Sequence, residues 1–146
     1  MRCRPAAAAL LALSAVLLAA CAGRSASTGA VFVRQADAAC AERAAAVRAL
    51  PFPTTGGDLL VLGVRVNALE EREQRRLARI AAPGDRRADM TAFVHSIDRV
   101  QRANAIFRDA FIRSNATDLA RARTSLASAR SASNTAARRL GLSCRH

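Results

Sequence analysis

Residues 90–111 read MTAFVHSIDRVQRANAIFRDAF and carry the strongest structural signal in the chain. Large side chains recur there at steps of three and four residues, which places them on one side of an α-helix. The spacing continues for about six turns, so it predicts a helix that packs along its length against other helices. This seam consists of Met90, Phe93, Ile97, Val100, Asn104, Phe107 and Phe111.

Two polar residues of this segment have different expected roles. Asn104 is the one polar member of the seam, and we expect it to fix register by pairing with a polar side chain of a facing helix. A ligand-binding role for Asn104 is the alternative. His95 falls nearly opposite Phe93 and Ile97 on the helix, so we expect an exposed histidine, neither a metal ligand nor a catalytic base.

Two further helical segments precede residues 90–111. The one nearer the N-terminus spans residues 30–49 and stops before Pro51 and Pro53, which cannot continue a helix. Its inward face is expected to hold Val33, Ala36, Cys40, Ala44 and Val47. The next begins near Asp58, a good N-cap residue, and its inward stripe is Leu59, Leu62, Val66, Leu69, Glu73, Leu77 and Ile80.

The charged stretch 70–76, EEREQRR, is expected to form a mostly solvated helix face. Glu71 with Arg75, and Glu70 with Gln74, stand four residues apart and support the helix. Glu73 falls at the edge of the apolar stripe, and we expect its carboxylate to reach solvent rather than to be a buried functional group.

Turn and cap residues delimit the last two helices. Asp85, after the turn at Pro83-Gly84, is the expected N-cap of the helix that contains residues 90–111. Asn115 is the expected N-cap of a fourth helix over residues 116–140, with Asp118 three residues later as in a capping box. Gly141 follows where a C′ glycine belongs. The fourth helix directs Leu119, Ala122, Leu126, Ala129, Ser133, Ala136 and Leu140 inward.

Four helices with short links predict an all-α, up-down-up-down four-helix bundle over residues 30–146. The small residues of the fourth helix predict close packing against its neighbours. If Phe93, Phe107 and Phe111 face those small residues, they either fill the core or leave an apolar pocket between the helices.

The N-terminus has the features of a secretory signal peptide. Arg2 and Arg4 precede an apolar run over residues 6–18, followed by small residues. The run is shorter than the roughly 20 residues that span a membrane, which disfavours an uncleaved anchor.

The stretch Leu18-Ala19-Ala20-Cys21 closes this signal and resembles the lipobox of bacterial lipoproteins. The resemblance implies cleavage after Ala20 and attachment of diacylglycerol to Cys21. Residues 1–20 are then the signal peptide and residues 21–29, small and polar, a flexible lipidated tether. A plain released signal peptide, with Cys21 there by chance, is the alternative.

Of the four cysteines, Cys3 leaves with the signal peptide and Cys21 carries the lipid. Cys40 and Cys144 remain as an even pair in an oxidising compartment, which predicts a structural disulfide. A metal site is disfavoured because the cysteines and histidines lack ligand spacing. A redox pair is disfavoured because no Cys-x-x-Cys is present. Because Cys40 lies about halfway along its helix, the tail after Gly141 must run back along the bundle.

The formal net charge is +12, and all 23 basic residues are arginine. This charge favours anionic lipid head groups or anionic envelope polymers as partners. The alternative is a solvated surface that reflects a GC-rich genome. Nucleic acid is disfavoured because the protein is exported and no aromatic residues interleave with the arginines.

No catalytic constellation, cofactor motif or metal-ligand spacing is evident in the sequence. It has two histidines, no Ser-based nucleophile elbow, no Gly-rich phosphate loop and no Glu-x-x-His pairs. We therefore expect no enzymatic activity and no cofactor.

Beyond the lipobox, the chain resembles small helical lipoproteins of high-GC Gram-positive bacteria. The resemblance rests on Val33-Arg34-Gln35-Ala36-Asp37-Ala38-Ala39-Cys40 and on Arg139-Leu140-Gly141-Leu142-Ser143-Cys144. It implies a fold, a disulfide and a place on the outer face of the cell membrane, and no catalytic residues. The expected function is that of a non-catalytic, lipid-anchored protein that binds envelope components or protein partners. The alternative is a small apolar-ligand-binding module with a pocket between the helices.

Overall fold

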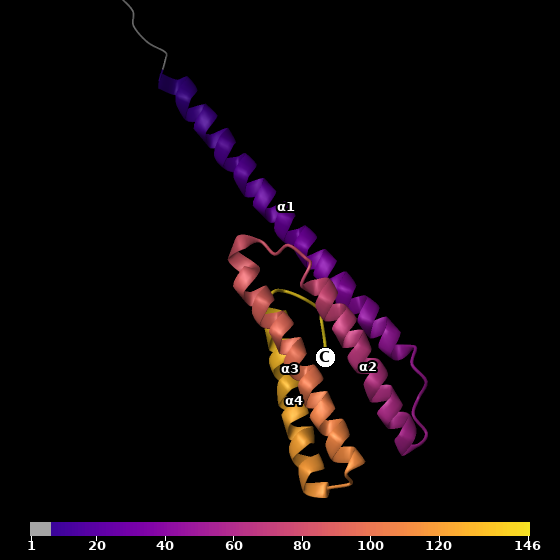
Figure 1. Ribbon diagram of the computed structural model, residues 1–146. Helices are drawn as coiled ribbons and strands as arrows, with labels where there is room; N and C mark the ends of the chain where they lie inside the picture. The colour runs from indigo at the N-terminus through magenta and orange to yellow at the C-terminus, as the bar shows by residue number, and fades with distance from the viewer. Residues whose placement is uncertain (1–6) are drawn as a thin grey trace, which may run out of the picture.

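The computed structural model describes the backbone of residues 7–146 and the side chains of residues 28–146. Four α-helices follow one another as α1 (Ala7–Arg48), α2 (Gly56–Leu77), α3 (Arg87–Ile112) and α4 (Ala116–Arg139), with a short 3₁₀ turn, η1 (Gly84–Arg86), before α3. Successive helices run in opposite directions, so the predicted up-down-up-down four-helix bundle is confirmed (Figure 1).

The first helix is longer than the sequence predicts. It was expected to begin at residue 30, but α1 begins at Ala7 and continues to Arg48 without a break. The backbone of residues 21–29, expected to be an irregular tether, is helical and continuous with the rest of α1, and the segment contains no proline that would interrupt the helix. The N-terminal part of α1 extends past the other helices (Figure 1).

Two of the four cap residues that the sequence predicts are confirmed, and both belong to the last helix. The Asn115 side chain accepts a hydrogen bond from the Asp118 backbone N–H at 3.0 Å. Gly141 has a φ of 73°, a left-handed conformation that glycine adopts without strain.

Two predicted caps are wrong. The N-cap of α2 is Thr55, and Asp58 is the third residue of the helix. The two side chains form a reciprocal capping box, because each accepts a hydrogen bond from the other's backbone N–H. Asp85 does not cap α3, because the chain makes the η1 turn first and α3 then follows Arg86 without a side-chain cap.

The core is densest in the half of the bundle that contains the C-terminal end of α2. There, α3 contributes the predicted Met90, Phe93 and Ile97, which are 0–5% exposed. Helix α1 is rotated slightly from the expected face, since Phe32 and Ala39 are buried beside Ala36 and Cys40. Where α3 packs against α4, the hydroxyls of Ser96 and Ser133 meet at 3.0 Å.

The first and last helices of the bundle do not pack closely backbone to backbone. In the part of the chain that the structure describes, α1 packs on α2, α2 on α3 and α3 on α4, whereas the backbones of α1 and α4 stay apart. The C-terminal tail, residues 141–146, turns back from the end of α4 and enters the space between the α1–α2 pair and the α3–α4 pair (Figure 1). The predicted return of the tail along the bundle is therefore confirmed.

Candidate functional site

The C-terminal tail is held against α1 by a disulfide and by hydrogen bonds. Cys40 and Cys144 form the predicted disulfide, with their Cα atoms 5.3 Å apart. The Ser143 backbone N–H donates to Asp37 Oδ1 at 2.7 Å, and the Arg43 guanidinium donates to the Arg145 carbonyl oxygen. Because Leu142 and Cys144 are also buried, the tail is a structural part of the core.

His146, the last residue, places its side chain in the interior of the bundle. Its imidazole is fully buried and meets the edge of the Phe93 ring, with ring centroids 5.9 Å apart. Its backbone N–H donates to Asn134 Oδ1 at 2.8 Å. No sequence pattern predicted this position, because His146 lies outside the periodic helical segments.

Glu73 is buried next to this histidine, so the prediction of a solvated carboxylate is wrong. It is 3% exposed, and its carboxylate lies 3.2 Å from Arg43 Nε and 3.8 Å from His146 Nδ1. Loss of hydration on burial is the main cause that raises the pKa of Glu73 from 4.5 to about 7, while the Arg43 cation opposes this rise. Burial, with Arg43 and Arg130 nearby, lowers the pKa of His146 to about 3.

Glu70 is also buried, at 2% exposure, although the sequence placed it on the solvated face. Asn104 donates a hydrogen bond to Glu70 Oε2 at 3.2 Å, which confirms that Asn104 pairs with a polar side chain of a facing helix. Burial raises the pKa of Glu70, and Arg43 and Arg130 lower it in part. Arg43, Glu70, Glu73, Asn104 and His146 thus form one buried polar cluster across the bundle.

Glu73 belongs to the inward stripe predicted for this helix, and Glu70 stands four residues after Val66 and three before Glu73. Both stand within the apolar stripe that runs from Val66 through Leu69 to Leu77, at the helical spacing of that stripe. The expected i,i+4 pair of Glu71 and Arg75 is present at 3.5 Å. The Gln74 side chain instead bonds to the Val94 carbonyl oxygen and to Gln101.

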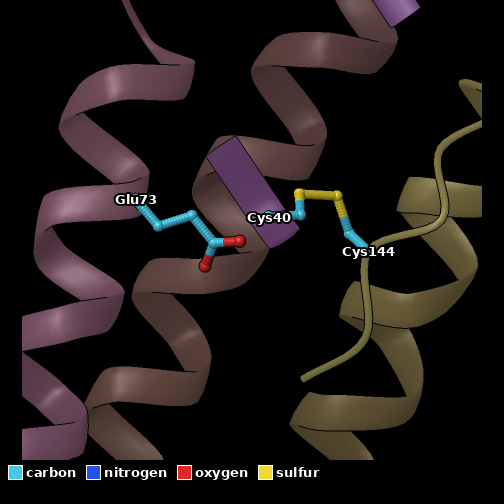
Figure 2. A group of neighbouring side chains, drawn as sticks. All are labelled: Cys40, Glu73 and Cys144. Atoms are coloured by element: carbon cyan, nitrogen blue, oxygen red, sulfur yellow. A yellow bond between two sulfur atoms is a disulfide. The ribbon is translucent and has the colours of Figure 1, made fainter. Parts of the chain in front are cut away.

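The carboxylate of Glu73 also faces the disulfide (Figure 2). Ligand-capable atoms of Cys40, Glu73 and Cys144 lie within 4.8 Å of one another, which is close enough for a metal ion. Both sulfur atoms are joined in the disulfide, so neither is available as the thiolate that a zinc site requires. In the oxidised protein, Glu73 is the one available ligand of the three.

An apolar pocket occupies the other half of the bundle interior. Its volume is about 390 Å³, within the range of roughly 300–1,000 Å³ that is typical of small-molecule sites. It lies between the N-terminal half of α2, the C-terminal half of α3 and the N-terminal half of α4. Its walls are formed by Leu59, Leu60, Leu62, Gly63, Val66, Asn104, Phe107, Arg108, Phe111, Arg123, Leu126 and Arg130.

The C-terminal tail and the pocket occupy different parts of the bundle. Beside His146 the tail fills the space between the helix pairs, where it meets Glu73, Phe93 and Asn134. None of the tail residues 141–146 belongs to the pocket lining. The seam residues Phe107 and Phe111, predicted to be core, are only half-buried and line the pocket.

Three arginines of α3 and α4 border this apolar pocket. Arg108 of α3 and Arg123 and Arg130 of α4 belong to its lining. Arg130 lies close enough to Glu70 to affect the pKa of that carboxyl. Arg108 and Arg123 have no carboxylate within ion-pair distance among the residues whose side chains the structure describes.

The remaining predicted residues lie elsewhere. His95 is exposed on α3, as expected. Leu18, Ala19, Ala20 and Cys21 lie in the N-terminal part of α1, and their side chains are outside the described residues. In the described part of the chain, none of the helices is both long enough and apolar enough to cross a membrane. Comparisons with family models, curated proteins and solved structures found no match to this chain.

Proposed function

We propose that this protein is a non-catalytic binding protein, anchored by lipid on Cys21 to the outer face of a membrane, with its ligand site in the pocket between α2, α3 and α4. The observation that carries the binding role is the apolar pocket of about 390 Å³ between α2, α3 and α4. Small-molecule sites are commonly apolar cavities between packed elements with a few polar groups at their edges.

The anchor rests on the sequence Leu18-Ala19-Ala20-Cys21 and its resemblance to a lipobox. Phe32 is the first buried large residue of α1 among residues 28–48, whose side chains the structure describes. Cys21 precedes it by about 16 Å of helix, at 1.5 Å per residue, so a lipid on Cys21 is well separated from the core. The Cys40–Cys144 disulfide supports an oxidising location outside the cytoplasm.

The buried polar cluster supports a structural rather than a catalytic role for its members. A general acid or base must come within hydrogen-bond reach of a substrate. The side chains of Glu73 and His146 are fully buried where the tail packs against the helices, and Glu70 already accepts a hydrogen bond from Asn104. The pocket, by contrast, is open to a ligand, because the side chain of Leu59 in its lining is half-exposed to solvent.

Decanol, a neutral apolar ligand, tests the binding role by isothermal titration calorimetry on the purified protein. We expect one saturable site. Gly63 lines the pocket, and a Cβ added there meets no atom within 4 Å. We expect Gly63→Leu to fill part of the space and weaken decanol binding by about tenfold or more, while Gly63→Ala retains most of the affinity. Equal affinity of all three proteins would refute the pocket as the site.

The intact mass of the protein from its membrane fraction tests the anchor separately. We expect loss of residues 1–20 and a gain in mass equal to a diacylglyceryl group. A Cys21→Ser variant provides the control, because it retains the apolar run but lacks the thiol that accepts the lipid. An unlipidated wild-type chain would refute the anchor and leave the pocket unaffected.

The net charge supports a second candidate function, the binding of anionic envelope polymers or lipid head groups. The chain carries 23 arginines against 11 acidic residues, and an excess of this size attracts anionic surfaces. Sedimentation with vesicles that contain an anionic phospholipid tests this function. We expect binding at low ionic strength that is lost near 0.5 M salt, and absence of binding at low salt would exclude it.

A further inference from the structure

We propose that the pocket accepts a single-chain anionic amphiphile, whose chain lies between α2, α3 and α4 and whose anionic head group is bound by Arg108 and Arg123. This inference rests on the proposed function, since it names the ligand class of the same pocket. Its basis is charge complementarity: an apolar cavity is bordered on one side by two arginines without a carboxylate partner in the described part of the chain.

The pocket is elongated along the bundle axis. Its lining spans residues 59–66 of α2, 104–111 of α3 and 123–130 of α4, so two turns of each helix contribute. Two turns correspond to about 10 Å. A cavity of this length and of about 390 Å³ suits one extended alkyl chain of moderate length better than a two-chain lipid.

The charges along the pocket define which way the amphiphile lies. Asn104 marks the inner end, where it donates its hydrogen bond to the Glu70 carboxylate. An anionic head group there would be repelled by Glu70, and Arg130, the third arginine of the lining, already interacts with Glu70. Arg108, half-buried on α3, and Arg123, exposed on α4, are therefore the two cations that remain for the head group.

An arginine is well suited to this role. Its guanidinium can donate two hydrogen bonds to a carboxylate, sulfate or phosphate, while its aliphatic stem continues the apolar wall. The shared chemistry of the ligand is thus a delocalised anion on one alkyl chain. Fatty acids and single-chain phosphate or sulfate esters both have this chemistry.

The test compares decanoate, decyl sulfate and decyl phosphate with decanol, by calorimetry below the micelle concentration. We expect decanoate to bind the wild-type protein at least about tenfold more tightly than decanol, because hydrogen bonds to charged groups are the strong ones. The relative affinities of decanoate, decyl sulfate and decyl phosphate then show which head group the arginines prefer.

The double variant Arg108→Gln, Arg123→Gln removes the proposed head-group site. Both side chains have access to solvent, so we expect the fold to persist, with an unchanged circular dichroism spectrum. We expect decanoate to lose at least about tenfold in affinity, while decanol binding changes by less than about twofold. The decanoate preference of the wild type should also weaken as salt is raised from 0.05 to 0.5 M.

The double variant Arg99→Gln, Arg139→Gln is the matched control. It removes the same charge from the same two helices, but both residues are exposed and lie outside the pocket lining. We expect it to retain the decanoate preference. If it loses the preference as the first variant does, the attraction comes from net charge and the inference is wrong.

Two further outcomes separate this inference from the proposed function. If decanol binds the wild-type protein as tightly as decanoate, the anionic specificity is wrong although the pocket is still a ligand site. If neither compound binds, both the inference and the pocket-binding role are refuted.

Discussion

Replacement of Glu73 by glutamine tests the description of the bundle interior. Glu73 is 3% exposed and lies beside Arg43, Glu70 and His146. Glutamine has nearly the same shape but does not ionise. The variant therefore removes the titration of this carboxyl while it retains the packing between α1, α2 and the tail.

The magnitude follows from the pKa of Glu73, which is about 7 in the folded protein against an ordinary value of 4.5. Because the folded-state pKa is raised, the protonated carboxyl stabilises the fold fully below pH 4.5. This contribution is lost as the pH rises through about 7. At 1.36 kcal/mol per pKa unit, the loss amounts to about 3 kcal/mol.

His146 acts in the opposite direction. Its pKa is lowered from 6.5 to about 3 in the folded protein, so its contribution is present above pH 6.5 and is lost as the pH falls toward 3. The two titrations oppose each other between pH 4.5 and 6.5 in the wild-type protein. The difference between wild type and Glu73→Gln isolates Glu73, because His146 is present in both.

Urea unfolding at pH 4.5, 6 and 8, followed by far-ultraviolet circular dichroism, measures this difference; the sequence lacks tyrosine and tryptophan for fluorescence. We expect the free energy of unfolding of wild type relative to the variant to fall by about 3 kcal/mol from pH 4.5 to 8. Glu71→Gln is the control: Glu71 pairs with Arg75 on the surface and should change the free energy by less than about 1 kcal/mol. A difference for Glu73→Gln that does not vary with pH would refute the burial of this carboxyl.

Three further predictions concern stability, each measured by urea unfolding at neutral pH. The double variant Cys40→Ser, Cys144→Ser opens a loop with a sequence separation of 104 and should lose up to about 5 kcal/mol; reduced wild type should show a similar loss, and equal stability would contradict a structural disulfide. Gly63→Ala should gain about 1 kcal/mol, because glycine is a poor helix former and the added Cβ meets open space; a loss would show that this space is filled. Asn115→Ala should lose about 1 kcal/mol with its cap to Asp118, and an unchanged midpoint would show that the cap does not form.

The sequence was sufficient for the fold because local and long-range signals agreed. The seam of α3, the prolines after α1, the Asn115 cap and Gly141 all act within a few residues, and the structure has each where predicted. The disulfide was also predictable, since the expected export left two cysteines to pair. Thr55 was missed because Asp58 was taken as the N-cap of α2, whereas it is the third residue of that helix.

The buried polar cluster could not be predicted because its burial depends on a distant segment. Glu73 would reach solvent if the space beside α2 were open, but the C-terminal tail covers it and brings His146 from 73 positions away. Charged residues on an amphipathic helix are ordinarily solvated, and that rule failed where another segment supplied the cover.

The pocket was predictable only in outline. The sequence suggested that phenylalanines opposite small residues of the fourth helix either fill the core or leave a pocket, and the structure shows both outcomes. Phe93 is fully buried against His146, whereas Phe107 and Phe111 line the pocket. The difference depends on which stretch of α3 the returning tail packs against, and no local pattern encodes this.

The central claim is that the pocket between α2, α3 and α4 is a ligand site, and methyl chemical-shift mapping with decanoate tests it most directly. We predict saturable shifts at Leu59, Leu62, Val66 and Leu126, which line the pocket, with Val31 on the exposed face of α1 unchanged. Shifts absent from the pocket methyls, or spread equally over Val31 and the other exposed apolar residues, would contradict the account.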